Sequence, residues 1–243
     1  MSSNTINQLL TIACRPYRQA GLFAWHFARG KLGRDPVFKG ILALGLLPKR
    51  DNIRVLDIGC GQGLLASWLL SAQAQNEKGT WPKHWPAPPT IAHIRGIELM
   101  PRDVERAQRA LQHAEDRTTF EVANMCTADF GTADAAVILD VLHYVDFPAQ
   151  DDVLKKVHAS LPDGGVLLLR VGDADGGLPF KISNWVDNVV TSIRGHRTLP
   201  RYCRTLAHWQ RDIAAIGFTV QAIPMNKGTP FANILLVCNK ESA

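Results

Sequence analysis

A glycine-rich turn between a short apolar strand and a helix is the part of this sequence best suited to bind a ligand. Residues 55–65 read VLDIGCGQGLL, so Asp57 is followed by Gly59, Gly61 and Gly63. Glycines allow a tight turn and let a ligand approach the backbone, and the first turn of the following helix presents free N–H groups. The segment therefore predicts a ligand site at the end of its strand.

The residues around these glycines exclude two phosphate-binding motifs. A dinucleotide fingerprint, G-x-G-x-x-G, would need a glycine where Leu64 stands, and the carboxylate of Asp57 would repel a diphosphate. The sequence also lacks G-x-x-x-x-G-K-[ST], so it offers no cradle for a nucleoside triphosphate. A carboxylate at a strand tip instead suits a ligand with an ammonium group or hydroxyls.

Strands and helices alternate from residue 53 onward, which is typical of a parallel sheet covered on both faces. The expected strands are residues 53–57, 94–98, 119–122, 135–139, 166–171, 218–223 and 232–239. The expected helices are residues 63–75, 101–114, 149–160, 182–193 and 205–216. A hairpin turn at 224–230 predicts an antiparallel strand at the edge of the sheet, and the Pro- and Trp-rich residues 76–90 predict a loop.

The first 50 residues predict helices and carry most of the positive charge. Apolar residues at helical spacing over 5–32 predict one helix kinked, or two helices divided, at Pro16 and Gly21, and a further helix is expected over 37–47, ending at Pro48. This segment holds eight basic residues against one acidic residue, and a second basic stretch covers 194–211. Two solvated faces or an anionic partner both explain this charge.

Residues 53–171 resemble the class I S-adenosylmethionine-dependent methyltransferases. VLDIGCGQG resembles the family's first motif, and RGIEL (95–99), EVANM (121–125), AVILDVLHYV (136–145) and LPDGGVLLL (161–169) resemble the next four. The resemblance implies an α/β fold: a doubly wound, mostly parallel, Rossmann-like sheet of seven strands with an antiparallel last strand and an N-terminal helical extension. It also implies S-adenosylmethionine as the cofactor.

The resemblance assigns cofactor contacts to the strand ends. Glu98 would accept both ribose hydroxyls, because a carboxylate has two oxygens for two O–H donors. Asn124 stands where an aspartate usually meets the adenine amine, and Arg29 is a candidate for the cofactor's carboxylate, with a solvated helix end as the alternative. The expected cofactor-binding residues are Asp57, Gly59, Cys60, Gly61, Glu98, Leu99, Asn124, Met125, Asp140, Val141 and Arg29.

Methyl transfer to a hydroxyl or ring carbon needs alignment and a general base. His143 is the first candidate for a catalytic base because it follows the fourth strand, and Tyr144 is the second, with His26 and His196 in reserve. Asp173 and Asp175 could hold a metal ion, but aspartates in a glycine-rich turn usually stabilise the turn. We expect no metal.

The expected organisation is a helical cap or substrate lid (1–50) on an S-adenosylmethionine-binding domain (51–243), with residues 172–204 as a substrate cap. Both caps are basic, which favours an anionic small-molecule acceptor, aromatic, phenolic or acyl, free or on an acidic carrier protein. The segments RPYRQAGLFAWHFARGKLGRDPVF and RVGDADGGLPFKISNWVD are faintly similar to methyltransferases of bacterial aryl polyene pigment clusters, so we expect a role in secondary metabolism.

Other activities and settings are less consistent with the sequence. An RNA methyltransferase would use the basic N-terminus as a phosphate track, and a non-catalytic module would have lost Asp57 or Glu98. DVLH at 140–143 is not the Asp/Asn-Pro-Pro-aromatic motif of DNA amino-methyltransferases. Five scattered cysteines and no long apolar run predict a cytoplasmic protein without a membrane span, as a monomer or homodimer.

Overall fold

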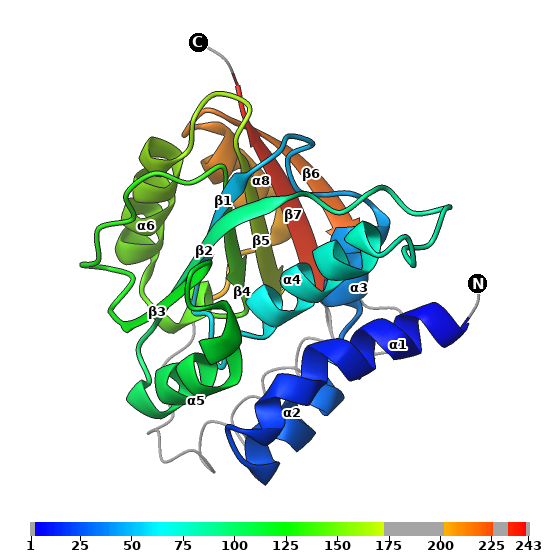
Figure 1. Ribbon diagram of the computed structural model, residues 1–243. Helices are drawn as coiled ribbons and strands as arrows, with labels where there is room; N and C mark the ends of the chain where they lie inside the picture. Colours follow the sequence, from blue (N-terminus) through cyan, green and yellow to red (C-terminus); the bar gives the residue numbers. More distant parts are fainter. Residues whose placement is uncertain (1–2, 173–201, 226–232, 242–243) are drawn as a thin grey trace.

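The computed structural model describes residues 3–172, 202–225 and 233–241. Its centre is a seven-stranded sheet with the order β3-β2-β1-β4-β5-β7-β6 (Figure 1). The strands are β1 (Ile53–Ile58), β2 (Ile91–Glu98), β3 (Thr118–Val122), β4 (Ala135–Leu139), β5 (Val166–Gly172), β6 (Phe218–Pro224) and β7 (Asn233–Lys240). β1 to β5 run parallel, and β7 is antiparallel to its neighbours. The predicted fold class, including the antiparallel last strand, is confirmed.

The predicted edge position of the last strand is wrong. β7 pairs with β5 on one side and with β6 on the other, so β6 forms the edge. The sequence of β7 explains this position: Leu235, Leu236, Val237 and Cys238 are all buried, and such an unbroken apolar run needs cover on both faces. Residues 226–232, most of the predicted turn, lie outside the described residues.

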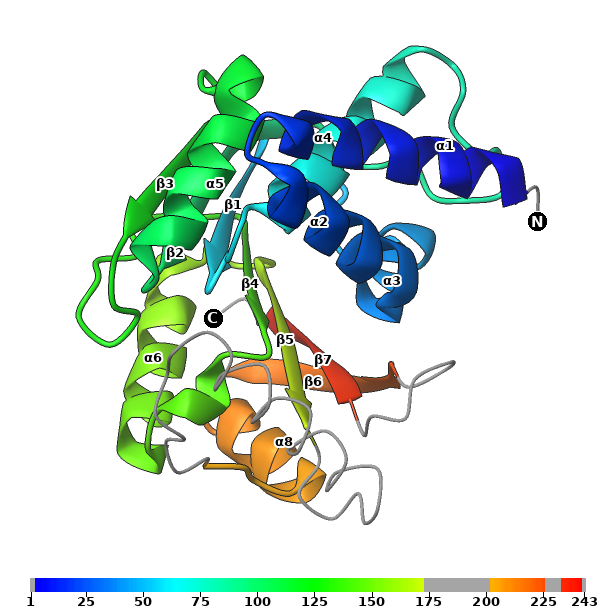
Figure 2. The ribbon, with the colours of Figure 1, turned by 90° about the horizontal axis from the view of Figure 1, so that it is seen from below.

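Helices cover both faces of the sheet. They are α1 (Ser3–Cys14), α2 (Leu22–Arg34), α3 (Pro36–Ala43), α4 (Leu64–Glu77), α5 (Pro101–Leu111), α6 (Phe147–Ser160) and α8 (Leu206–Ala214), with the 3₁₀ turns η1 (Arg15–Arg18), η2 (Gln112–Ala114) and η3 (Leu142–Tyr144). Alternate residues of the strands enter two separate cores, as Val55 and Leu56 do. Figure 2 shows α1 to α4 on one side of the sheet and α6 and α8 on the other.

The helical expectations differ from the structure mainly at helix ends. The division at Pro16 and Gly21 is confirmed, with η1 between α1 and α2. α3 ends at Ala43 instead of Pro48, because Gly45 adopts a φ of +60° and closes the helix earlier. The Pro- and Trp-rich loop is confirmed from residue 78, and Trp81 Nε1 fixes it by donating to the carbonyl of Pro86 at 2.9 Å. The helix expected at 182–193 lies outside the described residues.

The N-terminal helices are part of the main core. Tyr17 is fully buried, and its hydroxyl donates to the carbonyl of Gln62 in the glycine turn at 2.9 Å. Ser67 of α4 donates to the carbonyl of Ala13, and Trp68 donates to that of Phe38. These contacts fix α1, η1 and α3 against α4 and against the back of the predicted ligand site. Within the described ranges, no helix is long and apolar enough to cross a membrane.

Candidate functional site

Asp57 lies at the carboxyl end of β1 and carries a buried acid without a counter-charge. The residue is 4% exposed, and among the described residues no hydrogen-bond donor reaches its carboxylate. Burial, together with the nearby Glu98 carboxylate, raises the pKa of Asp57 to about 7. A buried carboxylate is costly unless it is paired, so this position fits a ligand that supplies an ammonium group.

Glu98 ends β2, next to β1, and is hydrogen-bonded to the glycine turn. Its Oε2 accepts from the backbone N–H of Gly61 at 3.0 Å, and its Oε1 accepts from that of Met100 at 3.0 Å. Each carboxylate oxygen can accept a further hydrogen bond. The side chain is thus held in place by the backbone and can still take two hydroxyls, as the sequence predicts. The structure brings Asp57, Gly61 and Glu98 together.

The glycines of the turn are needed for two different reasons. Gly59 has a φ of +75°, and a Cβ on it would lie 2.6 Å from Cγ1 of Val141. Gly61 has a φ of +54°, and a Cβ there would meet no described atom within 4 Å. Gly59 therefore allows the loop after β4 to approach, and the open space over Gly61 leaves room for a ligand. Cys60 is buried, and its Sγ would lie 2.7 Å from a Cβ on Gly96 of β2.

Replacing Gly59 by alanine is expected to lower the free energy of unfolding by about 2 kcal/mol or more, through left-handed backbone strain and overlap with Val141. Urea unfolding followed by circular dichroism measures the change. Gly79→Ala is the matched control, because Gly79 has a φ of +69° but free space around its Cβ position. Equal losses in the two variants would show that the contact with Val141 contributes nothing.

Two exposed apolar side chains lie beside Glu98, where a flat apolar group could pack. Leu99 is 61% exposed and Val122 is 53% exposed, and Val122 pairs in register with Glu98. Sequence analysis predicted a role for Leu99 but not for Val122. The signal that could have identified Val122 is its position as an apolar residue at the end of a strand that neighbours Glu98. Asn124 Oδ1 accepts from the backbone N–H of Cys126 at 2.9 Å, and Met125 packs against the α6-side core.

A buried ion cluster at the ends of β4 and β5 is the main feature that sequence reasoning missed. Arg170 of β5, with a side chain 1% exposed, donates to both Asp140 and Asp35, and its Nε lies 2.8 Å from Asp140 Oδ1. Lys31 adds a second cation, 2.8 Å from Asp35. Burial opposes ionisation of the two acids, but Arg170 and Lys31 outweigh it and hold the pKa of Asp35 and of Asp140 below the usual range.

This cluster shapes the loop that carries the predicted catalytic residues. Asp140 has a φ of +61°, which is rare for residues other than glycine, and its carboxylate accepts a hydrogen bond from Arg170. Val141 follows and lies against Gly59. His143 and Tyr144 form η3, with ring centroids 4.2 Å apart, and the His143 carbonyl accepts from the N–H of Tyr202 at 3.0 Å. Among the predicted residues of this loop, Val141 is the one that the structure places against the glycine turn.

The predicted basic residues lie in different surroundings. Arg29 lies over the ring of Trp25, 5.1 Å from its centroid, on the side of α2 opposite Lys31. Arg204 is buried and pairs with Asp151 and Asp212, so it holds residues 202–205 to α6 and α8. Asp173, Asp175 and His196 fall outside the described residues. Within the described ranges no group of three potential metal ligands occurs.

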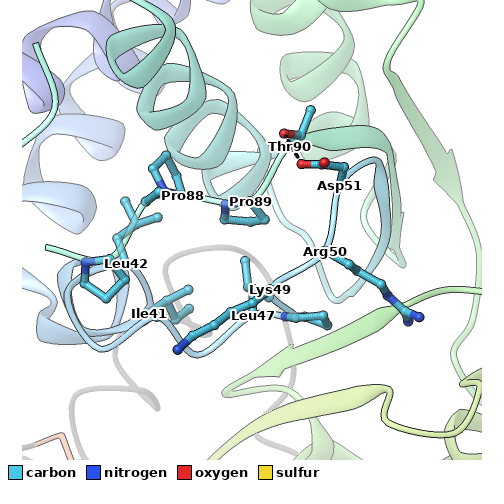
Figure 3. Close-up of a pocket in the computed structure, with 13 residues that line it drawn as sticks. Ile41, Leu42, Leu47, Lys49, Arg50, Asp51, Pro88, Pro89 and Thr90 are labelled. Carbon is cyan, nitrogen blue, oxygen red and sulfur yellow. Dashed lines mark hydrogen bonds between the residues drawn. The ribbon is translucent and has the colours of Figure 1, made fainter. Parts of the chain in front are cut away.

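A cavity of about 420 Å³ lies at the opposite, amino-terminal end of β1 and β2. Figure 3 shows Pro88 and Pro89 facing Ile41, Leu42 and Leu47 across it. The charged ends of Lys49 and Arg50 point away from its centre, and Arg50 pairs with Asp134. It includes none of the predicted site residues.

Solved structures share this fold at low sequence identity. A putative methyltransferase complexed with the Trm112 activator from Haloferax volcanii aligns with 93% of this chain and 98% of that chain, at a TM-score of 0.62 and 14% identity. Magnesium protoporphyrin IX methyltransferase from Synechocystis PCC 6803, solved with S-adenosylhomocysteine, aligns with 90% of this chain and 88% of that chain, at a TM-score of 0.57 and 19% identity. Human N-acetylserotonin methyltransferase, solved with S-adenosylmethionine, aligns with 93% of this chain and 58% of that chain, at a TM-score of 0.59 and 16% identity.

No curated protein matches the sequence significantly. Residues 25–223, well over half of the chain, match the family model described as a methyltransferase domain. This range begins within α2 and includes the glycine turn, Glu98, the Arg170 cluster and η3. The chain therefore belongs to the methyltransferase domain family.

Proposed function

We propose that the protein is an S-adenosylmethionine-dependent methyltransferase that acts on a small-molecule acceptor. The observation that carries the proposal is the buried, unpaired carboxylate of Asp57 beside an open glycine turn. The match to the methyltransferase domain family supports it, as does the fold shared with the human and Synechocystis methyltransferases, which were solved with S-adenosylmethionine and S-adenosylhomocysteine.

The residues present fit three parts of this cofactor: its ammonium group, its ribose and its adenine. Asp57 would pair with the ammonium group, and Glu98 would accept the ribose hydroxyls while it stays bound to Gly61. Leu99 and Val122 offer apolar surface for the adenine. The cofactor supplies a methyl group activated by its sulfonium sulfur.

The chain's own contribution is to orient the acceptor and to receive its proton. We assign the proton of the acceptor hydroxyl to an imidazole nitrogen of His143, so that the acceptor oxygen would be prepared to take the methyl group that the bound cofactor would supply. Tyr144 is the second candidate for this role. The 1–50 segment and the residues after β5 would border the acceptor, as the sequence predicts. Orientation and exclusion of water then supply most of the rate gain.

Replacing His143 by glutamine is expected to lower kcat about 100-fold or more, because a positioned general base contributes on that order. The KM for S-adenosylmethionine is expected to stay within about twofold, since the proposed role of His143 is at the acceptor and not at the cofactor. Initial rates of wild type and variant at saturating acceptor, measured against S-adenosylmethionine concentration, test both expectations. A variant with unchanged kcat would transfer the role to Tyr144, whose replacement by phenylalanine is the next test.

Product detection by mass spectrometry tests the function itself. The protein, S-adenosylmethionine and a panel of phenols, aromatic acids and carrier-bound acyl groups should yield an acceptor heavier by one methylene together with S-adenosylhomocysteine. Glu98→Ala should abolish the product at low cofactor concentration. Tight cofactor binding without turnover of any acceptor would favour a non-catalytic module.

A second candidate function is methylation of RNA, which is favoured by the surface of η1 and α2. Arg18 and Arg29 both lie over Trp25, with guanidinium carbons 5.0 and 5.1 Å from the ring centroid, and neither has a carboxylate partner among the described residues. Arginine and aromatic groups together can bind phosphates and bases. RNA affinity that falls steeply with salt and is lost in Arg18→Met/Arg29→Met would support this alternative.

A further inference from the structure

α2 passes across the carboxyl end of β1, where Asp57 and the glycine turn lie. At its start, the Arg106 guanidinium of α5 lies 4.7 Å from the ring centroid of Phe23. At its other end, Lys31 Nζ lies 3.6 Å from Asp140 Oδ2, directly after β4. Because α5 packs on β2 and β3, and β1 lies between β2 and β4, these two contacts of α2 fall on either side of β1 and of the proposed cofactor site. Figure 2 shows α2 on the same side of the sheet as α4 and α5.

One face of α2 is turned toward that site. Phe23, Phe27 and Lys31 recur every four residues and therefore share a side of the helix. The rings of Phe23 and Phe27 stack with centroids 6.2 Å apart and planes 9° apart, and Phe23 is 57% exposed. The Phe23 end of this face contacts Arg106 of α5, and the Lys31 end contacts Asp140 after β4. Arg29 lies on the other side, over Trp25. The face presents aromatic carbon followed by an ammonium group.

Lys31 keeps hydrogen-bonding capacity that its cluster does not use. Arg170 alone donates to both Asp35 and Asp140. The Lys31 side chain is 36% exposed, with Nζ 2.8 Å from Asp35 and 3.6 Å from Asp140, and the second distance is too long for a hydrogen bond. An ammonium group has three donors. At least one donor therefore remains for an oxygen outside the cluster.

We propose that Lys31 selects the acceptor by binding an anionic oxygen, while Phe23 and Phe27 contact the acceptor's ring. The acceptor class is a planar aromatic compound with a carboxylate or an acidic hydroxyl. This inference rests on the proposed function, because it places the acceptor beside the loop after β4. Lys31 would also favour the ionised form of a hydroxyl acceptor, since a nearby cation stabilises the phenolate.

Calorimetry with a neutral and an anionic probe tests the inference. 4-Hydroxybenzoate and 4-hydroxybenzamide are titrated separately into protein saturated with S-adenosylhomocysteine. The wild type is expected to bind the acid at least about tenfold more tightly than the amide, as a charge-assisted hydrogen bond implies. Lys31→Met should remove this preference, and Lys31→Arg should restore part of it. Phe27→Leu should weaken both probes.

Lys155→Met is the matched control, because it removes the same charge from an exposed side chain of α6 that pairs with Asp152, and it should keep the preference. Thermal melts of each variant check that it folds. Equal affinity of the wild type for acid and amide, an unchanged preference in Lys31→Met, or no binding of either probe to the loaded protein would overturn the inference. S-adenosylhomocysteine binding is measured first, and its absence would instead contradict the proposed function on which the inference rests.

Discussion

Replacing Asp57 by asparagine is expected to stabilise the cofactor-free protein above pH 7 while it removes cofactor binding. The pKa of Asp57 lies at about 7 in the folded protein and at 3.8 ordinarily, mainly because the group is buried. Between these values the unfolded chain has released the proton and the folded chain still holds it, so stability falls as pH rises. At pH 8 the free energy of unfolding of the asparagine variant should exceed that of the wild type by about 4 kcal/mol.

The two effects separate a ligand-binding acid from a structural one. Urea unfolding at pH 5 and pH 8 should show that the variant's free energy of unfolding exceeds that of the wild type by more at pH 8 than at pH 5. Asp152→Asn, which alters an exposed side chain paired with Lys155, is the control and should show no such growth. A variant less stable than the wild type at pH 8 would mean that the Asp57 carboxylate is stabilised within the fold itself.

Replacing Arg170 by methionine is expected to have the largest effect on stability. The variant leaves Asp35, whose side chain is 11% exposed, and Asp140 with Lys31 as their one counter-charge among the described residues. Removing one partner of a buried ion pair costs about 3–5 kcal/mol, because the remaining charge stays desolvated. Arg95→Met is the control: Arg95 pairs with the 40%-exposed Glu121, and such surface pairs contribute about 1 kcal/mol or less.

The loss in Arg170→Met should depend on pH in a defined direction. Arg170 and Lys31 hold the pKa values of Asp35 and Asp140 low, so the cluster's contribution is present above the unfolded pKa and is lost as pH falls through the folded values. The gap in unfolding free energy between wild type and variant should therefore narrow in acid. A gap that stays constant from pH 7 to pH 3 would contradict the role assigned to these charges.

The sequence predicted the glycine turn and its acids because their signals are local. Asp57 and Glu98 each end a strand, and parallel strands place their carboxyl ends at one edge, so their approach follows from the order of elements. Gly59 and Gly61 are recognisable because the turn needs backbone conformations that favour glycine.

The sequence could not predict contacts that depend on long-range packing. Asp35 and Arg170 are 135 residues apart and meet only because α3 begins at the ends of β4 and β5. The same cluster engages Asp140, for which the motif implied a contact with the cofactor. The place of β7 between β5 and β6 was also missed, since a hairpin between two strands does not show which of them pairs with the rest of the sheet. The one signal for the cluster was an arginine inside a buried strand.

Calorimetric titration of S-adenosylmethionine into wild type, Asp57→Asn and Glu98→Gln at several pH values tests the central claim most directly. The account predicts wild-type affinity that rises as pH increases through about 7, where Asp57 becomes charged, and a large loss in both variants. Glu105→Gln, which alters an exposed acid of α5, should bind as the wild type does. No binding by the wild type, or affinity unchanged in Asp57→Asn, would contradict the assignment of this site to the cofactor.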